Sequence, residues 1–508
     1  MSGAEQALAP VAVEGGLIAG IADVRRGQRQ WLGVPYAAAP VGELRWRPPA
    51  PVAPWSGVRA ADRLAPQCVQ PRRVPESVYA EYAGEQPMSE DCLYLNVFAP
   101  SEPPAAALPV MVWIHGGAFQ QGAGSNPVFV QGDLPGQGVV LVTLNYRLGP
   151  FGFLAHPALT RENGGASGNW GLLDIVAALE WVQRHIERFG GDPGRVTVFG
   201  QSAGAHAVTC LLAAPRARGL FVRAIAHSFG LSPMPTRAEG EAQGERFVRR
   251  VLEAQGPGAD PMRALAALRA MDAQALLERY LEQPERFMPI ADGALLAQAL
   301  PDVFAQGRQQ PLPLLIGWNR DEGTAFAPPA SDLAAFRAQL RERFQGERLA
   351  RAERLYTARD DAQARAASRM LFGDGLFGAG VLAAARAQAR IAPTYLYHFV
   401  HAQPFAAGQH YREADPASTL GAFHSAEYPY LFGSTRVLTR EWSDDDDAVT
   451  RLMQRAWVAF ARGGDPNTQG VPAWPEFTHG TASVMLIGPD ARAVELPQAQ
   501  RLSLFDQP

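Results

Sequence analysis

Short uninterrupted apolar runs alternate along this chain with segments whose apolar residues recur at helical spacing. Runs of this kind are typical of strands that are covered on both faces. The clearest runs are Val110–Ile114, Val139–Leu144, Val196–Phe199, Leu312–Gly317, Tyr395–Phe399 and Val484–Ile487. Strands that alternate with helices predict an α/β fold, with a large, mostly parallel central sheet flanked by helices.

Three long segments supply most of the predicted helix. Between Gly171 and Phe189, apolar residues recur every three or four positions, and Gly190-Gly191-Asp192-Pro193 ends that amphipathic helix. The segments 232–281 and 331–388 also have a helical pattern, and the second is rich in alanine and arginine. Because repeats and linkers of low complexity were not found, we expect a single domain over residues 1–508.

The N-terminal part follows a different pattern. Val11–Val13 and Leu17–Ala19 flank a Gly15-Gly16 pair, which predicts a small hairpin. The following stretch, Trp31–Trp55, is rich in proline and has aromatic anchors. Because proline cannot donate to a ladder, we expect this stretch to wrap the surface instead of entering a sheet.

Composition narrows the class of protein. The 508 residues are 47% hydrophobic and 19% charged, with a net charge of −4, which gives no electrostatic case for binding nucleic acid or anionic membranes. All 46 basic residues are arginine. The N-terminus has no signal-peptide pattern, and no run approaches the roughly 18 apolar residues of a membrane span. We expect a soluble cytoplasmic protein, monomeric or a small homo-oligomer, or an exported protein that has lost its leader.

Metal binding is not predicted. Three cysteines match no zinc spacing and exclude a disulfide scaffold, and Cys210 is expected in the core. The run Ser443-Asp444-Asp445-Asp446-Asp447 lacks the glycine and the distal glutamate of a calcium loop. We interpret Ser443 as the cap of a helix whose first turn carries aspartates that complement the helix dipole.

The segment Arg195–Leu212 carries the strongest chemical signal. An apolar run leads into Gly200-Gln201-Ser202-Ala203-Gly204, and apolar residues at helical spacing follow. Strand, tight turn with serine, and helix are the context of a nucleophile elbow. Ser202 is therefore the predicted nucleophile, at a helix N-terminus that favours negative charge.

A second glycine motif follows another predicted strand. His115-Gly116-Gly117 lies directly after Val110–Ile114, and glycines let backbone N–H groups approach a developing oxyanion without a collision with side chains. Together with the N–H of Ala203, this loop predicts an oxyanion hole.

The sequence pattern does not choose the acid and the base that such a nucleophile needs. Acids at the ends of predicted strands after Ser202 are Asp292, Asp321 and Glu322. Histidines farther along are His398, His401, His410, His424 and His479. His398 lies in an apolar strand and is expected in the core, whereas His424 lies in a loop before an aromatic stretch and suits a base.

Many motifs of this chain resemble those of the type B carboxylesterases, the family that includes bacterial p-nitrobenzyl esterases, mammalian carboxylesterases and cholinesterases. The motifs run nearly from end to end in the family's order: GVPYAAAPVGELRWRPP, SEDCLYLNV, HGGAF, NYRLGPFGFL, FGGDPGRVTVFGQSAGA, WNRDEG, the segment around His424, and FARGGDPN. The resemblance implies the α/β-hydrolase fold, with the helical segments 232–281 and 331–388 as insertions that form a gorge to the active site.

The resemblance also implies the function and its residues. It implies a serine carboxylester hydrolase with Ser202 as nucleophile, His424 as base and Glu322 as acid, acting through an acyl-enzyme on a small-molecule ester. Gly116, Gly117 and Ala203 would form the oxyanion hole, and Ser228 would match the family's serine beside the acid. No metal or organic cofactor is implied. An acyltransferase, amidase or carbamate hydrolase with the same triad is the main alternative, and a non-catalytic binding protein on this fold is a weaker one.

Departures from the family pattern concern specificity. Phe229 follows Ser228 where the family usually has glycine, so Phe229, together with Phe119, is expected to line the pocket. Cholinesterases have glutamate before the serine and a tryptophan in the loop that corresponds to Cys68–Cys92. This chain has Gln201 and no tryptophan there, which makes choline esters poor candidates.

Cys68 and Cys92 lie where many family members form a disulfide. Because a signal peptide was not recognised, we expect reduced thiols in the cell and pairing only after purification.

Overall fold

The computed structural model describes residues 6–253, 261–284, 286–326, 329–478 and 482–506. The chain divides into two compact units. Unit 1 comprises Met1–Arg72, Ala83–Ala224 and Ser232–Gln310, and unit 2 comprises Arg73–Tyr82, Ile225–Leu231 and Pro311–Pro508. Each unit is described by itself, and a single domain over residues 1–508 stays a prediction.

Unit 1 contains a sheet whose inner strands are parallel. Its strands, in spatial order, are β1 (Gln6–Ala7), β4 (Ile21–Asp23), β5 (Gln28–Pro35), β7 (Tyr94–Pro100), β9 (Val140–Leu144), β8 (Leu108–Ile114) and β10 (Gly191–Gln201). β8 pairs in parallel with both β9 and β10, and Val112 lies opposite Val142 and Val198. From β1 to β9 the pairing is antiparallel. Every residue of β9 is buried, which explains why its sequence is uninterrupted by charge.

The predicted N-terminal hairpin is confirmed. The prediction that Trp31–Trp55 does not enter a sheet is wrong for the first residues of that stretch. β2 (Val11–Val13) pairs with β3 (Gly16–Ala19), and β6 (Val58–Ala60) joins them in a second small sheet. Within Trp31–Trp55, the first five residues belong to β5, where Trp31 lies opposite Val97. Because the first proline of this stretch is Pro35, the last residue of the strand, proline does not interrupt the ladder before that point.

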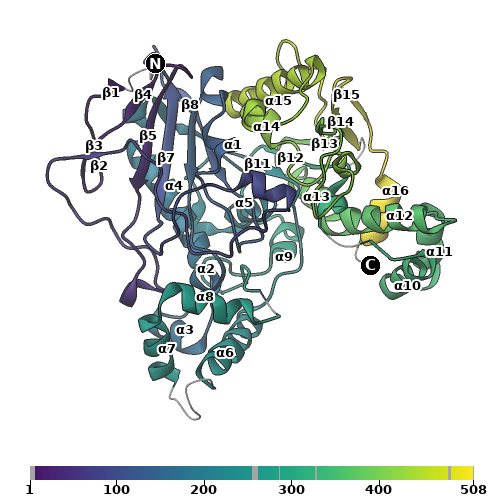
Figure 1. The fold of residues 1–508 in the computed structure, drawn as a ribbon, viewed down its shortest axis with the longest axis horizontal. Helices are drawn as coiled ribbons and strands as arrows, with labels where there is room; N and C mark the ends of the chain where they lie inside the picture. Colours follow the sequence, from purple (N-terminus) through teal and green to yellow (C-terminus); the bar gives the residue numbers. More distant parts are fainter. Residues whose placement is uncertain (1–5, 254–260, 285, 327–328, 479–481, 507–508) are drawn as a thin grey trace. The chain divides into compact units, whose positions relative to one another are not determined.

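The helices of unit 1 include every helix expected there. They are α1 (Pro127–Val130), α2 (Gly149–Phe153), α3 (Pro157–Glu162), α4 (Trp170–His185), α5 (Ala203–Ala213), α6 (Arg237–Glu253), α7 (Pro261–Ala270), α8 (Ala273–Leu281) and α9 (Leu300–Ala305). α4 is the predicted amphipathic helix, and Gly190 with a φ of +90° ends the short 3₁₀ turn after it. Figure 1 shows α3, α6, α7 and α8 gathered at one end of this unit.

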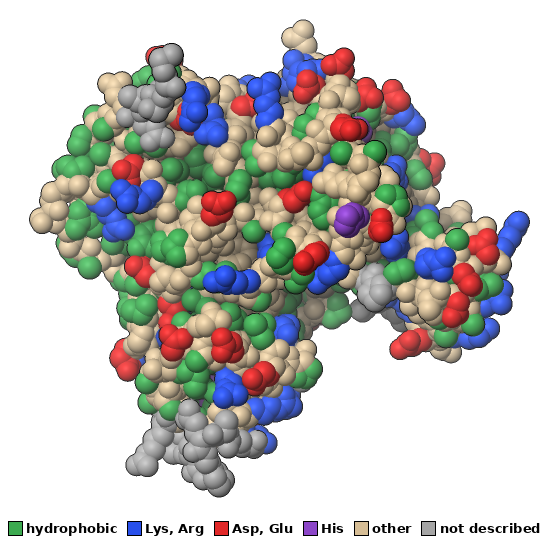
Figure 2. All heavy atoms as spheres, viewed as in Figure 1, with side chains coloured by type: hydrophobic (Ala, Val, Ile, Leu, Met, Phe, Trp, Pro, Cys, Tyr) green, Lys and Arg blue, Asp and Glu red, His purple; other side chains and the backbone are tan. Residues whose placement is uncertain are grey.

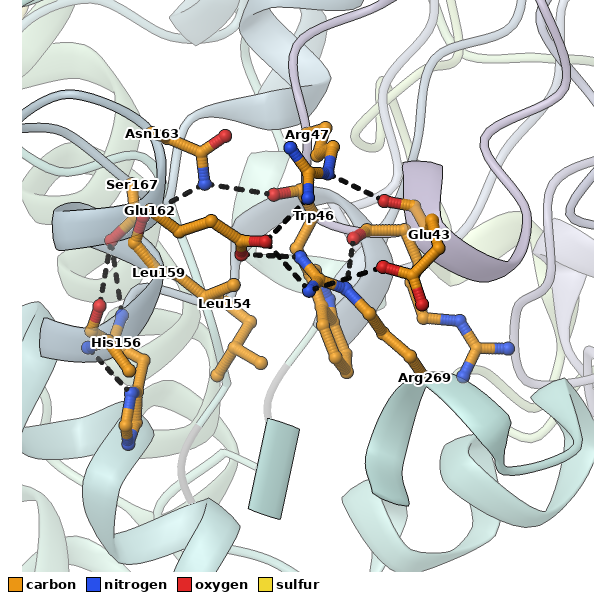
Figure 3. A network of polar contacts seen from close by, with 12 residues as sticks. Glu43, Trp46, Arg47, Leu154, His156, Leu159, Glu162, Asn163, Ser167 and Arg269 are labelled. Carbon is orange, nitrogen blue, oxygen red and sulfur yellow. Dashed lines mark hydrogen bonds and ion pairs between the residues drawn. The ribbon is translucent and has the colours of Figure 1, made fainter. Parts of the chain in front are cut away.

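A buried polar network ties α7 to the rest of unit 1 (Figure 3). Both oxygens of Glu162, the last residue of α3, accept from Arg269 of α7, at 3.0 and 2.7 Å. Arg47 donates to the same carboxylate at 2.6 Å, and the Nε of Arg269 donates to the carbonyl oxygen of Arg45. Because the guanidinium of Arg269 is largely withdrawn from water, the bidentate pairing with Glu162 is required to offset its desolvation.

Cys68 and Cys92 form a disulfide within unit 1, with their Cα atoms 5.1 Å apart. The pairing that the family resemblance implied is therefore present, and the expectation of two separate thiols does not describe this structure. Cys210 is buried on α5, as predicted.

Unit 2 contains four further strands and most of the remaining helices. β11 (Arg223–His227) lies where the chain passes from unit 1 into unit 2. The strands follow in the order β12 (Leu314–Asn319), β13 (Thr394–Phe399), β14 (Ser483–Ile487) and β15 (Arg492–Glu495). β12, β13 and β14 are parallel, and β15 is antiparallel to β14.

Helices of unit 2 confirm the helical pattern of 331–388. They are α10 (Leu333–Arg343), α11 (Gly346–Leu355), α12 (Asp361–Gly373), α13 (Ala379–Gln388), α14 (Tyr428–Phe432), α15 (Asp444–Gly463) and α16 (Ala499–Leu502). α10, α11 and α12 enclose a small core of their own, which includes Phe336, Leu340, Ala352, Tyr356 and Leu371. The role of this segment and of 232–281 in a gorge stays a prediction.

One helical run among the described residues, Asp361–Gln388, is long and apolar enough to cross a membrane by length and composition. The sequence analysis did not predict such a run. In the structure, 56% of its most apolar window is buried within the protein. Core helices pass the same test, so this run is weak support for a membrane span.

Ser443 is the N-cap of α15, as predicted, and the acidic run forms the first turn of the helix. The carboxylate of Asp446 accepts from both the backbone N–H and the hydroxyl of Ser443, at 2.9 and 2.8 Å. Its other oxygen contacts His401 and Tyr430. On the face that Figure 2 shows, arginines and carboxylates are interspersed among the coloured side chains, in agreement with the small net charge.

Candidate active site

Ser202 lies on the sharp turn between β10 and α5, as the sequence predicted. Its φ of +58° and ψ of −123° lie outside the regions that L-residues ordinarily adopt. Such a conformation costs on the order of 1–3 kcal/mol and persists only where the surrounding structure enforces it. Here the enforcing structure is the buried end of β10, Val196–Gln201, on one side and the buried helix α5 on the other.

The glycines of the elbow are explained by close backbone approaches. A Cβ at Gly204 would lie 2.0 Å from the carbonyl oxygen of Ile114, and one at Gly200 would lie 2.6 Å from the carbonyl carbon of Gly204. α5 therefore starts directly against the end of β8. A side chain at either position would push the helix away and move the backbone that aims Ser202.

The predicted oxyanion loop lies against the same turn. A Cβ at Gly116 would be 2.7 Å from the carbonyl oxygen of Gln201 and 3.1 Å from the Cβ of Ser202. Gly117 has a φ of +111°, where a Cβ would be 2.0 Å from the carbonyl oxygen of Gln121. Ala203 is the first residue of α5, so the helix has no acceptor for its N–H. The loop and the elbow are thus neighbours, and their role as donors to an oxyanion stays a prediction.

In unit 2, the structure pairs one of the candidate acids with one of the candidate bases. The Nδ1 of His424 lies 2.5 Å from Oε2 of Glu322, and both side chains are almost fully buried. The other oxygen of Glu322 accepts the backbone N–H of Asn319 at 2.7 Å. A carboxylate acceptor on Nδ1 favours the tautomer that leaves Nε2 with a lone pair, which is the form a general base needs.

Aromatic rings fix the imidazole of His424. Phe326 lies edge-on at 4.7 Å and Phe377 lies tilted at 4.6 Å between ring centroids. The hydroxyl of Tyr79 donates to the carbonyl oxygen of His424 at 3.2 Å. These contacts restrict the ring and the backbone of the loop while the Glu322 bond sets the proton position.

The other candidates have structural partners elsewhere. The carboxylate of Asp292 accepts N–H groups of its own turn, and that of Asp321 accepts the N–H of Ala422. His398 is buried in β13 between the carbonyl of Trp318 and Gln498, in agreement with its predicted core role. His401 pairs with Asp446, His410 is exposed, and His479 lies outside the described residues.

Ser228 and the two predicted pocket residues are placed as follows. Ser228 is buried with a φ of +55°, its N–H donates to the carbonyl of Gly317, and its hydroxyl makes no hydrogen bond among the described residues. Phe229 is half-buried. Phe119 is fully buried, with Phe153 at 5.0 Å and Tyr146 at 6.3 Å. That Ser228 supports the acid, and that Phe119 and Phe229 line the substrate pocket, stay predictions.

Residues other than glycine that have a positive φ are concentrated near the predicted site residues. Among the described non-glycine residues, six have φ between +55° and +76°. Five of them lie in segments to which the sequence assigned catalytic parts: Ala118, Phe119, Ser202, Ser228 and Ser425. In each unit, backbone with positive φ thus lies at or beside residues that the sequence analysis singled out.

Sequence reasoning missed Glu427, which lies three residues after His424. Its side chain is completely buried, and Oε2 accepts from the amide of Asn319 at 2.6 Å. Burial is the main cause that raises the pKa of Glu427 to about 8; the hydrogen bond from Asn319 opposes the rise, and the charge of Glu322 adds to it. A carboxylate between Ala426 and the aromatic Tyr428 was the signal in the sequence, because a charge in an apolar stretch needs a partner.

Replacement of Glu427 by glutamine is expected to flatten the pH dependence of stability. Because burial holds the folded pKa of Glu427 near 8 against an ordinary 4.5, its contribution is fully present below pH 4.5 and is lost as the pH rises to 8. The free energy of unfolding should fall by up to about 1.4 kcal/mol per pH unit in this window. Urea unfolding from pH 5 to 8.5 measures the slope.

The exposed Glu441 is the matched control for this experiment. Glu441→Gln should keep the slope of the parent protein, whereas Glu427→Gln should reduce it. Equal slopes in all three proteins would show that Glu427 is ionised across the whole range.

Comparisons with known proteins agree along the whole chain. The model of the carboxylesterase family matches residues 8–505. Fumonisin B1 esterase of Sphingopyxis macrogoltabida is 41% identical over 470 residues, which cover 88% of this chain and 81% of that protein. Para-nitrobenzyl esterase of Bacillus subtilis (strain 168) is 37% identical over 487 residues, 94% of each. A solved thermophilic PNB esterase is 34% identical with a TM-score of 0.83, over 98% of this chain and 99% of that one.

These comparisons show the class of protein: it has the α/β-hydrolase fold and is a carboxylic-ester hydrolase. The chain belongs to the carboxylesterase family. The predicted resemblance to type B carboxylesterases of the bacterial p-nitrobenzyl kind is thereby confirmed.

Proposed function

We propose that this protein hydrolyses small-molecule carboxylic esters through an acyl-enzyme on Ser202, with His424 as general base and Glu322 as the acid that orients it. The observation that carries the proposal is the buried 2.5 Å contact between His424 and Glu322. It supports the pair that the family resemblance implied, among the three acids and five histidines that the spacing left open. The elbow geometry at Ser202 supports the same assignment.

The proposed reaction begins with transfer of the Ser202 proton to Nε2 of His424 as Oγ attacks the ester carbonyl. The carboxylate of Glu322 stabilises the imidazolium that forms. Backbone N–H groups of Gly116, Gly117 and Ala203 would receive the oxyanion of the tetrahedral intermediate. The alkoxide then leaves with the proton from His424, and water attacks the acyl-enzyme by the reverse roles.

The test of this proposal combines rapid mixing with mass spectrometry. With p-nitrophenyl butyrate we expect release of p-nitrophenolate with continued turnover, and a fluorophosphonate that modifies activated serines should label Ser202 alone. A phosphonyl group on another residue, or none, would contradict the nucleophile. A burst without turnover would contradict hydrolysis and favour transfer of the acyl group to another acceptor.

The size of the acyl group provides a further prediction. Phe229→Gly is expected to raise kcat/KM for long-chain p-nitrophenyl esters about tenfold relative to the butyrate, because removal of the ring opens space on the acyl side. A chain-length series from acetate to decanoate measures the ratio. An unchanged profile would show that Phe229 does not limit the acyl group.

A further inference from the structure

A cavity of about 380 Å³ in unit 2 is lined by none of the residues assigned to ester hydrolysis. Its walls come from the turn after Glu322 and from α10 and α12. The residues that decide its chemistry are Gln339, Glu342, Arg343, Arg369, Leu371 and Phe372. Two of these are arginines, and one is an acid.

Neither arginine has a carboxylate partner among the described residues. Arg343 contacts the ring of Phe505 at 4.9 Å, and burial lowers the pKa of its guanidinium. Arg369 makes no hydrogen bond to a described residue, and its Nε is buried without a partner. Arg343 is exposed and Arg369 is half-buried, whereas the more deeply buried Arg147 and Arg269 each form an ion pair with a carboxylate at 2.7 Å.

The remaining wall offers a further donor and an apolar surface. The hydroxyl of Ser368 donates to Oε1 of Gln339 at 2.8 Å, so the amide group of Gln339 is still available as a donor. Leu371 and Phe372 supply apolar surface. Glu342 contributes one negative charge against two positive ones, so the lining keeps a net positive charge.

We propose that this cavity binds a small organic carboxylate, with its carboxylate on Arg343 and Arg369 and its hydrocarbon body on Leu371 and Phe372. Guanidinium groups pair with carboxylates in a bidentate geometry, so a bound carboxylate would supply the partner that both arginines lack among the described residues. The cavity is several times larger than an inorganic anion, and its apolar wall suits an alkyl or aryl chain.

The cavity adjoins the acid of the catalytic pair through the backbone. A Cβ at Gly323 would lie 2.0 Å from the carbonyl oxygen of Arg369, so α12 packs directly on the turn that begins with Glu322. The binding inference goes beyond ester hydrolysis and does not depend on Ser202.

The test is calorimetric titration of the protein with hexanoate at low ionic strength. Binding is expected at roughly millimolar concentration for so small a ligand, and hexan-1-ol, which lacks the charge, should bind at least tenfold more weakly. Arg369→Gln and Arg343→Gln should each weaken hexanoate binding about tenfold or more. Glu342→Gln should strengthen it, because the variant removes a like charge.

Arg337→Gln is the matched control, since Arg337 is an exposed arginine of α10 that does not line the cavity. Its affinity for hexanoate should stay within about twofold of the parent. Absence of binding, equal binding of hexan-1-ol, or equal losses in Arg337→Gln and the two cavity variants would overturn the proposal. Melting temperatures identify a variant that fails to fold, and two independent arginine variants keep the test decisive. Ester hydrolysis, measured in parallel, separates failure of this site from failure of the proposed catalytic residues.

Discussion

Ser202→Ala is expected to lower kcat for p-nitrophenyl butyrate by about 10⁵- to 10⁶-fold, because the oxygen that forms the acyl-enzyme is lost. KM should change little, since removal of one hydroxyl leaves the binding surfaces in place. Steady-state kinetics of the purified variant, with its circular dichroism spectrum compared with that of the parent, measures both effects. Residual kcat above about 1% of the parent would place the nucleophile elsewhere.

Glu322→Gln is expected to lower kcat by about 10⁴-fold while the fold is preserved. The amide of glutamine can donate to Nδ1 of His424, which places the ring proton on Nε2 and removes the lone pair that the base needs. The pH dependence of kcat/KM checks this reason, because only the neutral ring acts as a base and the wrong tautomer keeps the neutral ring inactive.

The control for Glu322 is Asp292→Asn, at the first of the acids that the sequence offered. Its carboxylate oxygen accepts backbone N–H groups of its own turn, and an amide oxygen can accept the same bonds. Activity within about threefold of the parent is expected. Comparable losses in the two variants would contradict the assignment of Glu322.

The centre of the fold could be predicted from the sequence because its physical signals are local. β8 and β9 are almost entirely buried, as is the second half of β10 from Val196 onward, so their sequences are dominated by apolar residues. The elbow could be predicted because its glycines are required by contacts a few residues away in the chain or on the neighbouring strand.

Outer strands of unit 1 could not be predicted in the same way. β5 reads Gln-Arg-Gln-Trp-Leu-Gly-Val-Pro, with half-buried positions and polar residues that interrupt the apolar pattern. It pairs antiparallel with the adjacent β4 and with β7, and the second pairing joins segments far apart in the sequence.

The sequence pattern alone did not identify the acid and the base, for a related reason. Glu322 and His424 are 102 residues apart, and neither local pattern distinguishes Glu322 from Asp321 or His424 from His401. The family resemblance implies this pair, and in the structure their contact in space supports it. Glu427 was missed because the pKa of a carboxyl group depends on its burial, which the sequence around it indicates but does not measure.

The left-handed backbone at Ser202, Ser228 and Ser425 has a consequence for how such enzymes evolve and are engineered. Glycine adopts these conformations without strain, so glycine at each position relieves the backbone while it deletes a hydroxyl. On the proposed mechanism, a screen that rewards heat resistance alone would therefore enrich for Ser202→Gly descendants that have lost the nucleophile. The same trade-off gives non-catalytic descendants of this fold a ready route to higher stability.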